Sequence, residues 1–98
     1  MPGLTIVYWR DIPAQVMVGK GRRAARRELP QRFAEAIDRA AMKSGADGTD
    51  AYLADWRREG PVETEGDPEA IVATAAEKLD ADYPLERLKS LIENGGRA

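Results

Sequence analysis

The chain contains no cysteine and no histidine. Without thiols it can form no disulfide, hold no iron–sulfur cluster and offer no thiolate nucleophile. Without imidazole it lacks the usual general base at neutral pH and the commonest zinc ligand. The sequence therefore predicts no cofactor. These absences argue against an enzyme without deciding the question.

Long hydrophobic runs are also missing. No apolar stretch approaches the roughly 20 residues that a membrane-spanning helix needs. The start of the chain lacks the basic region followed by an apolar region that marks a secretory signal. We therefore expect a protein that makes no membrane contact and lies in the cytoplasm.

Carboxylates are the only metal ligands left to consider. Asp47, Asp50 and Asp55 lie close together in the sequence. Their spacing lacks the glycine and the terminal glutamate of a calcium-binding loop. We therefore expect no metal site.

Charge is distributed unevenly along the 98 residues, which are few enough to predict a single domain over 1–98 with a small core. Residues 1–43 carry nine Lys or Arg against four Asp or Glu, and residues 44–98 carry six against thirteen. The two halves can neutralise each other in the fold, or they can present two faces of opposite sign. Both alternatives stay open from the sequence.

Two short runs near the start alternate in the manner of strands. Residues 4–10 are β-branched and aromatic on both faces, which predicts a central strand. Residues 14–18 alternate again, and Pro13 marks the turn between the two runs. The pattern predicts a β-hairpin.

A basic segment follows the hairpin and precedes a clear helix. A continuous helix over 20–43 would place arginines on the apolar stripe of Phe33 and Ile37, so we expect the helix to begin at about Pro30. Residues 20–29 are then predicted to form a separate turn or a short exposed helix. The helix over 30–43 is expected to stop at Gly45.

The rest of the chain predicts one more strand and two helices. Residues 51–58 fit either a strand or a helix, and we favour the strand because a hairpin alone is marginal. We expect an acidic loop over 59–67, with Asp67 capping C-terminal helices over 68–94. The resulting ββαβαα order predicts an α+β fold, a two-layer sandwich of a three-stranded antiparallel sheet with helices on one face.

Arginines and tryptophans are the candidate binding residues. Guanidinium groups at 22–27 can bind phosphate or carboxylate groups, although they can also pair with the acidic half of the chain. Trp9 and Trp56 suit either the core or an interface. Arg10 and Asp11 can form a polar site or simply a turn.

The strings TIVYWRDIPAQVMV and LPQRFAEAIDRAAMKSGADGTDAYLADWRR, separated by the basic run, resemble the small bacterial virulence factor domain family. The resemblance covers about residues 4–58, and a related domain is expected in larger conserved virulence factor C proteins. It implies no reaction and no catalytic residue. It does imply an accessory role near corrinoid and folate one-carbon proteins. The matching positions are Tyr8, Trp9, Arg10, Asp11, Pro13, Gln15, Arg39 and Trp56.

Our leading expectation is a non-catalytic binding or adaptor module that docks on a partner protein, and a homodimer is compatible with it. One alternative is a binder of a phosphorylated small ligand or of nucleic acid, although the pI of about 5.2 argues against nucleic acid. Another is an enzyme subunit that lends Arg10 or Asp11 to a shared active site. The candidate binding residues are Trp9, Arg10, Asp11, Gln15, Arg22, Arg23, Arg26, Arg27 and Trp56.

Overall fold

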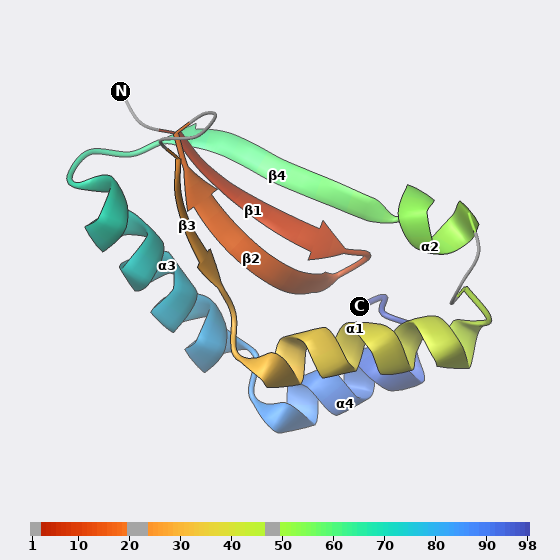
Figure 1. Cartoon of the computed structure of the whole chain (residues 1–98). Coiled ribbons are helices and arrows are strands. Elements are labelled where there is room, and N and C mark those ends of the chain that lie inside the picture. Colours follow the sequence, from red (N-terminus) through yellow and green to blue (C-terminus); the bar gives the residue numbers. More distant parts are fainter. Residues whose placement is uncertain (1–2, 20–23, 47–49) are drawn as a thin grey trace.

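A computed structural model describes residues 3–19, 24–46 and 50–98. An antiparallel four-stranded sheet, in the order β3-β2-β1-β4, packs with four helices (Figure 1). The strands are β1 Gly3–Trp9, β2 Ile12–Val18, β3 Ala25–Glu28 and β4 Trp56–Glu63. The helices are α1 Gln31–Ser44, α2 Asp50–Ala54, α3 Pro68–Asp82 and α4 Leu85–Glu93. The predicted α+β class and antiparallel sheet are confirmed. The predicted number of three strands was wrong, because the sheet has four.

The additional strand, β3, lies in the basic segment that we predicted to be a turn or a short exposed helix. It pairs with β2 from Val18 opposite Ala25 to Gln15 opposite Glu28. A strand at the edge of a sheet tolerates charged side chains, because only one backbone edge is paired and the side chains reach solvent. The prediction of a turn or a short helix was therefore wrong, because a basic composition is compatible with an edge strand.

The segment over 51–58 divides into two elements, so the single predicted strand was wrong. Its first part forms the short helix α2, and β4 begins at Trp56, which pairs with Trp9. The strand then runs to Glu63, through most of what we predicted to be an acidic loop. A register shift between Leu4 and Ile6 accommodates the Gly60-Pro61 step. The observed order is βββααβαα.

The predicted helices are confirmed with small changes at their ends. Helix α1 ends at Gly45, whose φ of 75° is the left-handed conformation of a C-cap. The Asp67 side chain accepts a hydrogen bond from the Ala70 backbone N–H at the start of α3. Tyr83 and Pro84 separate α3 from α4, as expected.

The two faces of the sheet have different neighbours. Helix α3 packs against β2 and β3, and the buried cluster joins Val16 and Val18 to Val72. The opposite face carries Val7, Gln15 and Glu28, which pair across β1, β2 and β3. This second face, hereafter the open face, is bordered by α1 at one end (Figure 1). The expectation that all helices cover one face was therefore too simple.

None of the helices in the described ranges is long and apolar enough to cross a membrane.

Candidate functional site: a pocket on the open face of the sheet

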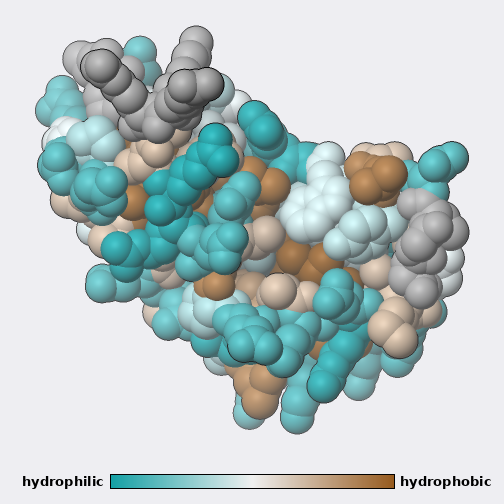
Figure 2. Space-filling view, viewed as in Figure 1, coloured by the Kyte–Doolittle hydropathy of each residue, from teal (hydrophilic) through white to brown (hydrophobic). Residues whose placement is uncertain are grey.

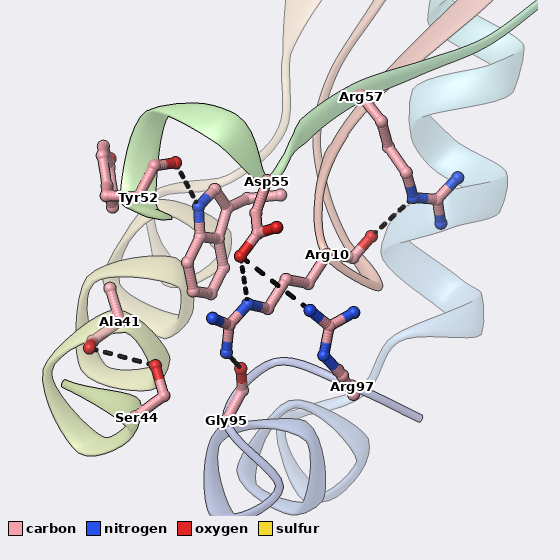
Figure 3. A network of polar contacts seen from close by, with 9 residues as sticks. Arg10, Ala41, Ser44, Tyr52, Asp55, Arg57, Gly95 and Arg97 are labelled. Atoms are coloured by element: carbon pink, nitrogen blue, oxygen red, sulfur yellow. Dashed lines mark hydrogen bonds and ion pairs between the residues drawn. The ribbon is translucent and has the colours of Figure 1, made fainter. Parts of the chain in front are cut away.

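The β1–β2 turn is anchored by the side chain of Arg10 (Figure 3). Its Nε donates to Asp55 Oδ2 at 2.8 Å, and its Nη1 donates to the Gly95 carbonyl at 2.6 Å. The guanidinium carbon lies 4.6 Å from the centre of the Trp9 ring. Only 12% of the side chain is exposed. Arg10 therefore joins the turn, the start of β4 and the C-terminal segment.

Asp11 belongs to the same internal network. Its Oδ2 accepts from the backbone N–H of Ala98 at 2.6 Å, and its Oδ1 lies 3.3 Å from Nη2 of Arg57. Arg57 Nε also donates to the Arg10 carbonyl at 2.9 Å. The carboxylate and guanidinium groups of this turn are thus engaged within the molecule, which leaves Arg10 and Asp11 little capacity for a shared active site.

Trp9 lies in the core with no exposed surface. Its indole Nε1 donates to the Tyr52 carbonyl at 2.8 Å, which ties α2 to β1. Gly96 lies so close that a Cβ there would meet Trp9 Cζ3 at 2.8 Å. Trp9 therefore acts as a structural centre, and its predicted binding role stays a prediction.

Tyr8 lies on the other face of β1, beneath the guanidinium of Arg57 at 4.5 Å from the ring centre. Burial, with a smaller contribution from Tyr83, raises the pKa of the Tyr8 phenol above 10.0.

The raised pKa of Tyr8 makes the stability of the fold depend on pH, because the unfolded chain would lose the phenol proton at lower pH than the folded one. Stability is therefore expected to fall as pH rises from about 10 through the raised pKa. Tyr8→Phe should reduce that alkaline loss in urea unfolding measured at several pH values, and an unchanged slope would contradict the assignment.

A pocket of about 330 Å³ opens between the open face, α1 and α2. In Figure 2, apolar surface lies at the centre of this view and is framed by hydrophilic residues. The strands and the segment after β3 contribute Val7, Ala14, Gln15, Glu28, Leu29 and Trp56, and the helices contribute Ala34, Ile37, Asp38 and Tyr52. Side chains distant in the sequence thus meet around one small concave surface.

Two aromatic rings form one wall of the pocket. Tyr52 and Trp56 have ring centres 6.0 Å apart and planes at 86°. Both are only partly buried. The Trp9–Tyr52 hydrogen bond and the Trp9–Trp56 strand pairing fix their backbone positions. Arg10 and Asp55, which are next to Trp9 and Trp56 in the sequence, are joined by a hydrogen bond that also helps to hold this wall in position.

Charges around the pocket are segregated. Glu28 and Asp38 line it, are exposed, and make no ion pair within the described ranges. Arg58 pairs with Val7 and so shares the open face, and Arg26 pairs with Met17 on the same face. Neither arginine lines the pocket or forms an ion pair with a described residue. Two acidic groups therefore line the pocket and two basic groups lie elsewhere on the open face, all four without an ion-pair partner among the described residues.

The candidate residues from the sequence do not form one surface. Gln15 and Trp56 line the pocket, and Arg26 lies on the same face. Arg27 pairs with Val16 and points to the opposite face. Arg22 and Arg23 lie outside the described residues. Arg26 and Arg27 therefore do not form a single patch along β3, because neighbouring side chains of a strand alternate in direction.

Sequence reasoning missed Glu28, Asp38 and Arg58 as site residues. Glu28 stands at the end of a basic run, and Asp38 belongs to the wet face of an ordinary amphipathic helix. Only the pairing of β3 with β2 brings them together across the pocket. Among the described residues no three acidic side chains gather in a way that could hold a metal ion.

Comparison with known proteins gives a family but no individual relative. No curated protein and no solved structure matches the chain. A family model described as virulence factor matches residues 7–92, which extends the expected resemblance from β1 through α4. The chain therefore belongs to the virulence factor family.

Proposed function

We propose that the protein is a non-catalytic binding module that docks on a partner protein through the open face of its sheet. The observation that carries the proposal is that one face combines a pocket walled by Tyr52 and Trp56 with Arg26 and Arg58, which form no ion pair with any described residue. Tryptophan, tyrosine and arginine are the residues most enriched at the energetic centres of protein interfaces.

The polar side chains that would suit catalysis make hydrogen bonds and ion pairs within the protein. Arg10, Asp11 and Asp55 hold the turn, β4 and the C-terminal segment together. The opposite directions of Arg26 and Arg27 weaken the alternative of a single phosphate-binding arginine cluster. Proteins of corrinoid and folate methyl transfer are the partner class that we propose to test first.

Arg26 and Arg27 supply a matched test of the docking face. Both are exposed, both lie in β3, and their side chains point to opposite faces. Arg26→Glu is expected to reduce partner recovery about tenfold, because a rim charge of the wrong sign slows association and weakens the contact. Arg27→Glu makes the same charge change and is expected to leave recovery unchanged.

The measurement is affinity capture from a bacterial extract with the tagged chain, followed by quantitative mass spectrometry and a direct titration of the recovered protein. Arg58→Glu should reproduce the effect of Arg26→Glu, since it lies on the same face. Equal losses for Arg26→Glu and Arg27→Glu would place docking elsewhere on the molecule.

A further inference from the structure

We propose that the pocket on the open face binds an organic cation, namely an ammonium or guanidinium group carried on an alkyl chain. The inference deepens the proposed function, since it names the chemistry that the same face would recognise, but its test needs no partner protein. Three independent properties of the pocket lead to it.

The first property is that the two rings of the pocket differ from the other aromatic rings of the chain in their cation–π contacts. It has six such residues. Four of them carry a guanidinium from the chain itself, with the carbon 4.1 to 4.7 Å from the ring centre; these are Tyr8, Trp9, Phe33 and Tyr83. Tyr52 and Trp56 receive no cation from the described residues. They are also the two rings that line the pocket.

The geometry of those two rings suits a cation. An aromatic face is the negative part of the ring quadrupole, so it attracts ammonium and guanidinium groups. Two rings at 86° with centres 6.0 Å apart make a corner. Walls set at an angle to each other are how aromatic cages surround a cation. The ring corner can therefore make the same kind of cation–π contact that the fold uses at its other aromatic rings.

The second property is the charge of the lining. Among the residues that the structure describes, Glu28 and Asp38 are the only carboxylates in the pocket lining, and none of the described lysines or arginines lines it. Neither carboxylate has an ion-pair partner in the part of the chain that the structure describes. The Gln15 side chain adds a carbonyl acceptor. A cation would meet acceptors here, while an anion would meet two like charges.

The third property is the size and composition of the pocket. At about 330 Å³ it lies at the small end of ligand pockets, which run from about 300 to 1,000 Å³. Val7, Leu29, Ala34 and Ile37 supply apolar surface beside the acidic groups. An alkyl stem can pack on that surface while its charged head meets the carboxylates. Such a ligand is either a small free amine or a lysine or arginine side chain of a partner.

The test uses the purified full chain and proton–nitrogen correlation NMR. The probes are butylammonium and butylguanidinium, with neutral 1-butanol and anionic butyrate as matched controls. Both cations are expected to shift the backbone signals of Tyr52 and Trp56 and the Trp56 indole signal, with saturation. The neutral alcohol and the anion are expected to bind at least about tenfold more weakly.

Variants assign the effect to the named groups. Glu28→Gln with Asp38→Asn is expected to weaken cation binding at least about tenfold, and Trp56→Leu should weaken it comparably. Glu77→Gln with Glu93→Gln removes two exposed carboxylates away from the pocket and should leave binding unchanged. Dispersed spectra are the check that each variant keeps the fold.

A capped peptide with one lysine separates the two sources of the cation. Tighter binding of the peptide than of butylammonium would identify a partner side chain, and equal binding would identify a free amine. Equal binding of 1-butanol, or cation binding that is insensitive to Glu28 and Asp38, would overturn the inference. Partner capture that depends on Arg26 would still stand in that case, so failure here is distinguishable from failure of the docking proposal.

Discussion

Gly96→Ala is expected to destabilise the protein by about 3 kcal/mol, because it combines backbone strain with a clash in the core. The φ of Gly96 is 92°, a region that residues with a side chain rarely adopt. The added methyl carbon would stand 2.8 Å from Trp9 Cζ3. Trp9 is fully buried and hydrogen-bonded to the Tyr52 carbonyl, so its ring cannot shift to relieve the clash without losing packing or this hydrogen bond. Urea unfolding followed by tryptophan fluorescence would measure the loss.

Gly45→Ala provides the control for this experiment. Gly45 also has a positive φ, 75°, but nothing lies within 4 Å of the position that its Cβ would take. Its substitution should cost only the backbone strain, about 1 kcal/mol. The difference between the two variants then measures the close packing of the C-terminal turn on Trp9. Equal losses would show that this turn does not hold Trp9 in place.

Arg10→Met is expected to lower the free energy of unfolding by about 2 to 3 kcal/mol, because it removes two hydrogen bonds made by a charged and largely buried donor. Asp55 would lose its 2.8 Å partner, and the Gly95 carbonyl would lose a donor at 2.6 Å. Asp55 would remain partly buried, with 27% of its side chain exposed. Equilibrium urea unfolding would report the change.

Arg97→Met tests whether proximity to Asp55 alone is enough. Nη2 of Arg97 lies 3.9 Å from the same Asp55 oxygen, but 61% of the Arg97 side chain is exposed. An exposed pair of this kind contributes about 0 to 1 kcal/mol. A double-mutant cycle of Arg10→Met with Asp55→Asn should show strong coupling, whereas the cycle with Arg97→Met should show almost none. Similar coupling in both cycles would mean that burial does not decide the strength of the contact.

Local signals predicted the hairpin and the three long helices well. Residues 4–9 form a strand as predicted, and they alternate so that Leu4, Ile6 and Tyr8 lie on one side of β1 and Val7 and Trp9 on the other. The predictions that Asp67 caps α3 and that α1 ends at Gly45 are also confirmed. These features depend on neighbours within one turn or one strand, which a sequence displays directly.

The rest of the fold depended on pairing between distant residues. Nothing local distinguishes the Arg-rich strand β3 from an exposed turn, since its partner β2 supplies the reason for its extended shape. Residues 51–54 satisfy both a helix and a strand pattern, and the Trp9 indole that binds the Tyr52 carbonyl in the fold lies 43 positions away. Tertiary contacts override local preference in both places.

The candidate site was only partly predictable for the same reason. Trp56 was a candidate as an interface residue type and Gln15 as a position that matches the family, and both line the pocket. Arg10 and Asp11 were expected to form a polar site or simply a turn, and the C-terminal residues that contact them lie more than 80 positions away in the sequence. Glu28 and Asp38 become a pair only when β3 and α1 border the same hollow.

The interruption of β4 at Gly60 and Pro61 also bears on self-association. This strand lies at the end of the sheet and is exposed along most of its length, so its outer backbone could recruit a strand from a second molecule. Pro61 has no N–H to contribute to such a ladder, and the register shift beside it breaks the regular spacing of donors and acceptors. The irregular step at Gly60 and Pro61 therefore makes this edge a poor template for the addition of strands from further molecules.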